Sequence, residues 1–296
     1  MIRKMSIPTE VMQQPRKLIA GYTDAHLDAR LYRYMQHIMG NRLIPAPISM
    51  QGMRTVLDIG CGAGDWLIDL AHRYPSVQMY GLDINQETLK LARERSNYSH
   101  LTNIQWRQID SLQDVSLPDS YVDLIHLRRC HYWITPQRWR TFFAACARLL
   151  KPGGWIAVTN IEMTELSSSA FVALRRAQWR TLNKLHHCMD PTANNYGSLP
   201  RLPRMLHESS FSRVGYELYA IDLGFMSGLS GQCFLSNLLQ NIYSTRDTII
   251  AQGELTEDTF DALFSQLRLD VQDPYLCGWG FLISAWGRCC KEEEGR

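Results

Sequence analysis

"VLDIGCGAGDWLIDLA", residues 56–71, reads as a buried strand that passes through a glycine-rich corner into an amphipathic helix. Three of the five residues from 60 to 64 are glycines. Glycine weakens strands and helices alike, so this corner indicates a backbone that turns tightly or approaches another group closely. A nucleotide-like ligand at the start of the helix is the usual reason for such a corner. The stretch therefore predicts a ligand-binding turn between a strand and a helix.

Strand-like and helix-like segments alternate on both sides of this corner. Apolar, strand-like runs occur at 54–59, 77–82, 104–109, 122–127 and 155–160, and helical periodicity occurs at 64–73, 86–96 and 136–150. This alternation is typical of a parallel sheet covered by helices on both faces. We predict a doubly wound α/β fold whose ligands lie beyond the carboxyl ends of the strands.

The chain divides into three predicted parts. Residues 1–50 form a helical amino-terminal lid, with one helix over 24–40, and residues 51–162 form the ligand-binding core. Residues 163–296 complete the sheet and add helical insertions that cover a substrate. The segments expected there are helices at 167–188, 201–209, 229–251 and 256–269, and strands at 213–222 and 280–287.

Composition excludes several classes of function. The chain has 296 residues and a net charge of +2, which gives no general electrostatic case for binding nucleic acid or an anionic membrane. No apolar run reaches the roughly 18 residues of a membrane span, and the amino terminus lacks the apolar region of a signal peptide. We therefore expect a cytoplasmic protein. The eight cysteines include no C-x-x-C pair, so neither a metal site nor a disulfide framework is expected.

Two common ligands fit the corner poorly. A dinucleotide-binding corner carries a third glycine at position 65, where this chain has Asp65, and the signature of a phosphate-binding P-loop is absent. Asp58 stands two residues before the first glycine. A carboxylate there would repel pyrophosphate and attract an ammonium group.

This arrangement resembles motif I of the class I S-adenosylmethionine-dependent methyltransferases. Further features occur in that family's order: Asp83 in "GLDI", Asp110 in "QIDS", Asp123 opening the fourth strand, and "LKPGG" at 150–154. The resemblance covers about residues 54–160 and implies a seven-stranded, mostly parallel, Rossmann-like sheet.

The resemblance also implies S-adenosylmethionine as cofactor. Asp58 would face its methionine amino group, Asp83 its ribose hydroxyls, and Asp110 its adenine amine. The full set of residues expected to contact the cofactor is Asp58, Gly60, Cys61, Gly62, Asp83, Ile84, Asn85, Asp110, Ser111 and Arg128.

The methyl acceptor is predicted from the end of the fourth strand. "LRRCHYW", residues 127–133, lacks the Asn/Asp-Pro-Pro-aromatic motif typical of nucleic-acid and protein amide methylation, and the chain contains no Pro-Cys pair. Arg128 stands where metal-dependent relatives need a carboxylate, so no metal is expected. A small or medium-sized organic acceptor of apolar or aromatic character remains, and a homodimer is compatible with the sequence.

The subfamily and the role in the cell are narrower questions. "LIPAPISMQGMRTVLDIGCGAGDW" and "VDLIHLRRC" are similar to methyltransferases of bacterial and fungal secondary metabolism, including fungal regulators. We therefore expect methylation of a specialised metabolite. The alternative is a non-catalytic regulatory protein that binds S-adenosylmethionine.

Catalytic and substrate-binding residues are expected around the ends of the fourth and fifth strands. His131 is the first candidate for a general base and Glu162 the second, while His126 is expected to point into the sheet packing and be inert. Aromatic residues of the lid segments and of the loop after the fourth strand are expected to line the acceptor pocket: Tyr22, Tyr132, Trp133, Trp179, Tyr196 and Phe225.

Overall fold

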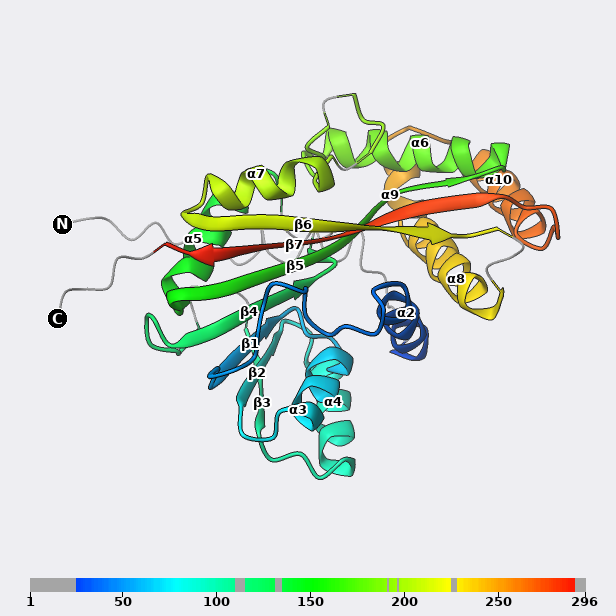
Figure 1. Ribbon diagram of the computed structural model, residues 1–296. Helices are drawn as coiled ribbons and strands as arrows, with labels where there is room; N and C mark the ends of the chain where they lie inside the picture. Colours follow the sequence, from blue (N-terminus) through cyan, green and yellow to red (C-terminus); the bar gives the residue numbers. More distant parts are fainter. Residues whose placement is uncertain are drawn as a thin grey trace.

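The computed structural model describes residues 25–109, 115–130, 135–190, 192–195, 197–224 and 228–290, which form one seven-stranded sheet with helices on both faces (Figure 1). The strands are β1 (Thr55–Ile59), β2 (Gln78–Asp83), β3 (Ile104–Gln108), β4 (Val122–Arg128), β5 (Leu150–Leu166), β6 (Phe211–Asp222) and β7 (Gly278–Cys289). The helices are α2 (Ala25–Ile38), α3 (Asp65–Arg73), α4 (Gln86–Tyr98), α5 (Trp139–Leu149), α6 (Ser169–Lys184), α7 (Leu202–His207), α8 (Gly228–Ser244), α9 (Arg246–Ala251) and α10 (Glu257–Asp270).

The strand order confirms the predicted doubly wound sheet. It runs β3-β2-β1-β4-β5-β7-β6. The strands β1 to β5 are all parallel to one another, and β7 is antiparallel to β5 on one side and to β6 on the other. After β1 the chain adds β2 and β3 on one side of β1, and it then crosses over to add β4 on the other side of β1. The carboxyl ends of β1 and β4 therefore border the switch point where open α/β sheets bind ligands.

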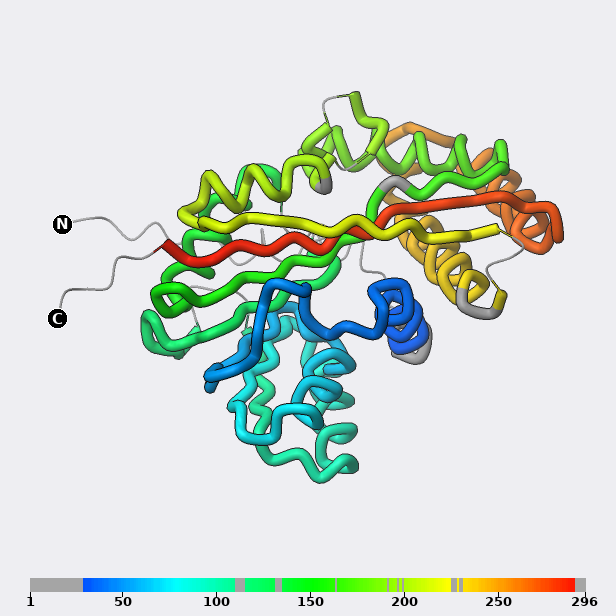
Figure 2. Tube along the Cα trace, viewed as in Figure 1, coloured from blue at the N-terminus to red at the C-terminus, as the bar shows by residue number. Residues whose placement is uncertain are grey.

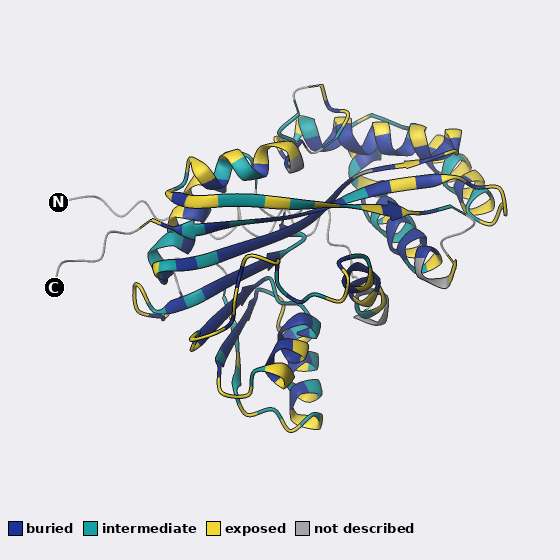
Figure 3. Cartoon of the chain, viewed as in Figure 1, coloured by how far each residue is buried: buried dark blue, intermediate teal, exposed yellow. Residues whose placement is uncertain are grey.

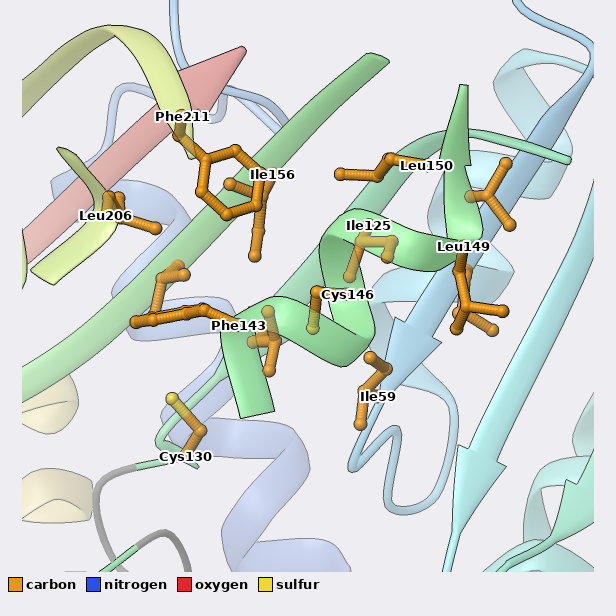
Figure 4. Packing of buried hydrophobic residues seen from close by; sticks show 14 of the residues in the cluster. Ile59, Ile125, Cys130, Phe143, Cys146, Leu149, Leu150, Ile156, Leu206 and Phe211 are labelled. Carbon is orange, nitrogen blue, oxygen red and sulfur yellow. The ribbon is translucent and has the colours of Figure 1, made fainter. Parts of the chain in front are cut away.

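Each face of the sheet has its own hydrophobic core. On one face, α5 and α7 pack against the central strands, and Figure 4 shows Phe143 and Cys146 of α5 meeting Ile125 and Ile156 of the sheet. On the other face, α3 packs Leu67 and other apolar residues against β1 and β2. Figure 3 shows the central strands buried and the edge strand β6 made mostly of exposed and partly buried residues.

A third core lies where the long strands leave the central sheet. Strand β5 has 17 residues, and its carboxyl half pairs with β7 as far as Leu166 opposite Gly278. The helices α2, α6, α8 and α10 gather around this extension (Figure 2). Helices from the predicted parts 1–50 and 163–296 thus come together although they are far apart in the sequence.

Two predicted boundaries differ from the structure. The fifth strand is predicted over 155–160, but β5 already begins at Leu150, which pairs with Val122. Gly153, with φ of 74°, lies within an irregularity of that strand, where the register against β4 shifts between Val122 and Leu124. The helical stretch expected at 229–251 is two helices, α8 and α9, separated at Thr245.

No helix in the described ranges is both long enough and apolar enough to cross a membrane.

Candidate functional site

The glycine-rich corner is bound to the end of β2 by backbone hydrogen bonds. The backbone N–H groups of Gly60 and Cys61 both donate to the carbonyl oxygen of Leu82, at 2.7 and 3.0 Å. The next glycine, Gly62, donates its N–H to Oδ2 of Asp83 at 2.9 Å. The corner therefore stands beside the carboxyl end of β2, and Asp83 belongs to both.

Asp83 organises two loops at once. Its Oδ1 accepts the backbone N–H of Asn85 at 2.9 Å, while Oδ2 holds Gly62. Asn85 caps α4 by accepting from the N–H groups of Glu87 and Thr88. The N-cap of α4 is therefore Asn85, and Asp83 stands two residues before it.

The three glycines of the corner, all with positive φ, differ in their surroundings. A Cβ on Gly64, where φ is 81°, would stand 2.4 Å from the indole of Trp106 on β3. A Cβ on Gly62, where φ is 54°, would meet no atom of the described residues within 4 Å. Gly64 is therefore required by packing, whereas Gly62 borders open space beside the Asp83 carboxylate.

Asp58 is buried and paired across the sheet. It lies opposite His126 in the register of β1 and β4, and its Oδ1 is 2.8 Å from Nδ1 of the imidazole. The His126 ring stacks on Trp66 of α3 with centroids 3.6 Å apart, and the Trp66 indole donates to the carbonyl of Leu43. His126 points into the packing as predicted, but it also orients the Asp58 carboxylate.

His126 predicts a pH dependence of stability. Burial holds the pKa of this imidazole below its ordinary value, although the Asp58 carboxylate acts in the opposite direction. As the pH falls, the unfolded chain, with a histidine pKa of about 6.5, takes up the proton first. We expect the stability contributed by the neutral ring to be present above about pH 6.5 and lost as the pH falls below it.

Denaturant unfolding of the wild type and of His126→Asn across this pH range checks the expectation. The asparagine amide retains a donor near the position of Nδ1 but does not titrate. The free-energy difference between the two proteins should shrink as the pH falls. A difference that is constant with pH contradicts the prediction.

Arg128 ends β4 beside Asp58 and His126 and is partly buried, with Nε and Nη1 of its guanidinium shielded from solvent. Its guanidinium lies 4.9 Å from the ring centroid of Tyr32 on α2. The Gln36 side chain of α2 satisfies both its amide oxygen and its amide nitrogen in one orientation. In that orientation its oxygen accepts from Nη2 of Arg128 at 2.9 Å. The other two nitrogens, Nε and Nη1, have no hydrogen-bond acceptor among the described residues. A cation with two buried, unused donors requires an acceptor, preferably an anion.

Glu162 lies near the carboxyl end of β5 and is also buried, with 2 % of its surface exposed. Its carboxylate accepts hydrogen bonds from the backbone N–H groups of Gly197 and Ser198 and from the Ser198 hydroxyl. Three donors from one loop therefore converge on this side chain. In the described residues, Glu162 holds the loop at 197–198 against the sheet.

A pocket opens next to Glu162 between β5, α2, α6 and α8. Its apolar wall consists of Leu31, Ile161, Phe234 and Leu238. Trp179 of α6, which the sequence predicted, also lines it. Arg129, the residue directly after β4, borders the same pocket. The pocket therefore begins one residue beyond Arg128, at the ends of β4 and β5.

The structure brings several predicted residues together. Asp58, Gly60, Cys61, Gly62, Asp83, Ile84, Asn85 and Arg128 lie at the carboxyl ends of β1, β2 and β4, and Glu162 and Trp179 lie at the pocket. Eight predicted residues lie outside the described ranges: Tyr22, Asp110, Ser111, His131, Tyr132, Trp133, Tyr196 and Phe225.

Sequence reasoning missed several polar residues that line the pocket, among them Arg175 on α6 and Asn237 on α8. A signal existed for Arg175. It follows Phe171 and Leu174 on the side of α6 that is otherwise apolar and buried, so a cation interrupts a core-facing stripe. Asn237 stands in a mostly apolar helix and gave no comparable pattern.

Comparisons with known proteins agree with this geometry. Residues 56–154 match a family described as a methyltransferase domain. The methyltransferase str2 of Strobilurus tenacellus is 27% identical over 168 residues, which cover 56% of this chain and 54% of that protein. The secondary metabolism regulator laeA of Aspergillus niger is 26% identical over 190 residues, which cover 62% of this chain and 46% of that protein. The chain spans about half the length of these curated relatives.

The fold has solved counterparts. The phosphoethanolamine N-methyltransferase 2 of Haemonchus contortus, solved in complex with S-adenosyl-L-methionine, aligns with a TM-score of 0.53 and 16% identity. The alignment covers 98% of this chain and 62% of that one, and at this identity it shows the fold alone. The match over residues 56–154, the ordered motifs around the glycine corner and the sheet order lead to one conclusion: this part of the chain is a methyltransferase domain.

Proposed function

We propose that this protein binds S-adenosylmethionine at the carboxyl ends of β1, β2 and β4 and transfers its methyl group to a small organic acceptor in the pocket beside β5. The observation that carries the proposal is Arg128 near the glycine corner, since two buried nitrogens of its guanidinium have no acceptor among the described residues. The methionine carboxylate of the cofactor is an anion of the kind this cation needs.

The residues around Arg128 fit the rest of the cofactor. Gly62 leaves open space at the corner, so a ligand can approach its backbone closely. Asp58 and Asp83 add two carboxylates, which suit a ligand with an ammonium group, a sulfonium and ribose hydroxyls but no phosphate. When bound, S-adenosylmethionine supplies an electrophilic methyl group on its sulfonium.

The acceptor is assigned to the pocket because of where the pocket begins. Arg129 lines it and directly follows Arg128, so the acceptor pocket adjoins the proposed cofactor site. Holding acceptor and methyl donor side by side turns the transfer into an effectively intramolecular step. The apolar wall of the pocket supports an acceptor with an apolar or aromatic part.

A specialised metabolite is the proposed type of acceptor. The name of the laeA relative, a regulator of secondary metabolism, and the sequence segments that resemble this group support that assignment. No feature of the described residues favours a non-catalytic regulator, so we do not propose that alternative.

Two experiments test the function. Calorimetry with S-adenosylmethionine and S-adenosylhomocysteine tests cofactor binding. If the folded protein gives no heat of binding with either compound, the proposal is wrong. Incubation with methyl-labelled S-adenosylmethionine and an extract of the source organism tests transfer. A labelled small molecule supports methyl transfer, whereas label in nucleic acid or protein, or no label at all, contradicts it.

Arg128→Met makes the cofactor assignment specific. We expect the affinity for S-adenosylhomocysteine to fall by about 10–100-fold, because a charge-assisted hydrogen bond contributes about 1.5–3 kcal/mol. Calorimetry measures the loss. This variant is cleaner than Asp83→Ala, because Asp83 also holds the N–H groups of Gly62 and Asn85 and its removal would disturb both loops.

The neighbouring Arg129→Met is the matched control. Arg129 lines the acceptor pocket, so its replacement should leave the affinity for S-adenosylhomocysteine nearly unchanged. Thermal melting shows whether each variant is folded. An Arg128→Met protein that melts like the wild type and binds S-adenosylhomocysteine equally well shows that this cation is not part of the cofactor site.

A further inference from the structure

The carboxylate of Asp58 lies beside the cation that the proposed function assigns to the cofactor's own carboxylate. Asp58 stands opposite His126 in the register of β1 and β4, and Arg128 follows two residues further along β4. Residues two apart on a strand share a face of the sheet, so the three side chains project to the same side. Burial lowers the pKa of the Arg128 guanidinium, whereas Tyr32 and Asp58 act in the opposite direction, so this carboxylate is close to the cation.

This proximity indicates which acidic residue faces the ammonium group of S-adenosylmethionine. In the methionine part of the cofactor, the ammonium and the carboxylate are bonded to the same carbon atom. Their binding groups on the protein must therefore be neighbours, as Asp58 and Arg128 are. Asp83 lies at the end of β2, where it accepts the backbone N–H groups of Gly62 and Asn85. With Arg128 on the carboxylate, the ammonium faces Asp58.

His126 is hydrogen-bonded to the same carboxylate. Its Nδ1 is 2.8 Å from Oδ1 of Asp58, and the two residues are only 2 % and 3 % exposed. A neutral imidazole can carry its proton on either nitrogen, and a carboxylate partner fixes the proton on Nδ1, which donates. The described residues supply no hydrogen-bond donor to the second oxygen, Oδ2. That oxygen is therefore available to the ligand.

The imidazole ring is held in place and kept neutral. It stacks on Trp66 with centroids 3.6 Å apart, and the Trp66 indole donates to the carbonyl of Leu43 at 2.7 Å. Burial lowers the pKa of His126, Asp58 acts in the opposite direction, and the positive charge of Arg128 lowers it further. A neutral ring orients the carboxylate without cancelling its negative charge. A positively charged ring would compete with the ammonium of the ligand.

We propose that His126 is a positioning residue of the cofactor site, which turns the Asp58 carboxylate toward the ammonium of S-adenosylmethionine and so selects ligands that carry this amino group. The inference rests on the proposed function, since it concerns the same cofactor. His126 acts through Asp58 and does not touch the cofactor. A carboxylate that is oriented before the ligand arrives loses little conformational freedom on binding.

Two ligands that differ only in the amino group test the proposal. S-Adenosylhomocysteine carries the amino group. In its deamino analogue a hydrogen atom replaces that group, while the carboxylate, the thioether and the adenosine are retained. Calorimetry measures the affinity of each protein for both ligands. We expect the wild type to bind S-adenosylhomocysteine more tightly than the analogue by at least about tenfold, because it gains a charge-assisted hydrogen bond.

His126→Leu and His126→Asn form a matched pair of variants. Both remove the ring that stacks on Trp66, and their side chains are similar in size, but only the asparagine amide retains a donor near the position of Nδ1. His126→Leu should lower the affinity for S-adenosylhomocysteine by about 3–10-fold and leave the affinity for the deamino analogue unchanged. His126→Asn should retain most of the wild-type preference. A role in packing alone would weaken the binding of both ligands alike.

A measurement on the wild type makes the test independent of whether the variants fold. In protein with isotope-labelled histidine, NMR follows the Nδ1–H group of His126, which burial protects from exchange with solvent. S-Adenosylhomocysteine should shift this resonance more than the deamino analogue does. The reason is that the ligand's ammonium polarises the carboxylate to which the group donates.

The outcomes separate this inference from the proposed function. If the wild type binds S-adenosylhomocysteine no more tightly than its deamino analogue, the positioning role is overturned and the function stands. The same conclusion follows if His126→Leu retains the wild-type preference, if His126→Asn has no more preference than His126→Leu, or if the two ligands shift the Nδ1–H resonance equally. If the folded wild type binds neither ligand, the proposed function itself is overturned, and this inference falls with it.

Discussion

His131→Ala is expected to lower methyl-transfer turnover by about 10²–10⁴-fold when the acceptor is a hydroxyl or an amine. His131 follows Arg128, the last residue of β4, by three positions in the sequence and lies outside the described residues. We propose that its imidazole accepts the acceptor's proton near neutral pH as the methyl group is transferred. The affinity for S-adenosylhomocysteine should be nearly unchanged, because the base acts on the acceptor.

Glu162 provides the comparison. Its carboxylate holds Gly197 and Ser198, and in Glu162→Gln an amide N–H₂ would face one of these N–H donors in place of an oxygen. We therefore expect Glu162→Gln to lower the melting temperature and to raise KM for the acceptor, with a smaller effect on kcat. Both variants are assayed with the acceptor that methyl labelling identifies.

The two variants decide between the candidate bases. If Glu162→Gln loses turnover while His131→Ala retains it, Glu162 is the base and the assignment made here is wrong. If both variants remain active, the acceptor needs no base, and proximity accounts for the transfer. That result fits an acceptor atom that is already nucleophilic.

Gly64→Ala is expected to lower the free energy of unfolding by about 2–5 kcal/mol. Its φ of 81° costs an alanine roughly 1–2 kcal/mol. The new methyl group would also stand 2.4 Å from Trp106, and overpacking of this kind costs about 1–3 kcal/mol. Trp106 has little freedom to move away, because its indole donates to the Ser96 hydroxyl at 3.0 Å. Denaturant unfolding measures the loss.

Gly62→Ala is the matched control on the same loop. It has a positive φ of 54° but no neighbouring atom among the described residues, so it should lose only about 1–2 kcal/mol of stability. Its main effect should be weaker binding of S-adenosylhomocysteine, because the added methyl group fills the open side of the corner. Trp106→Phe in the Gly64→Ala background should recover part of the lost stability. Equal losses of stability in the two glycine variants would contradict this division of roles.

Much of the core was predictable because its signals are local. The buried strands, the glycine corner and the helices between them follow from patterns within about ten residues of each position. The corner also predicted that Asp58 and Asp83 face one ligand site, since the carboxyl ends of parallel strands meet at one edge of the sheet. The resemblance to a family with ordered motifs supplied the cofactor and the number of strands.

Contacts between distant segments were not predictable. The partner of Asp58 is set by the register of β1 against β4, which brings His126 opposite it. The different roles of Gly62 and Gly64 depend on Trp106, which reaches the corner from β3. The sequence around each of these residues contains no periodicity or motif that indicates its partner.

The sequence by itself determined the doubly wound core, the glycine corner and the methyltransferase domain, because strand and helix patterns and short motifs depend on neighbouring residues. Only the tertiary structure decided that β5 extends past the core and that α6 and α8 bring Arg175 and Asn237 into one pocket. The physical reason is that a binding pocket is formed by side chains from separate elements. Their distances depend on strand register and helix packing, which act across the whole chain.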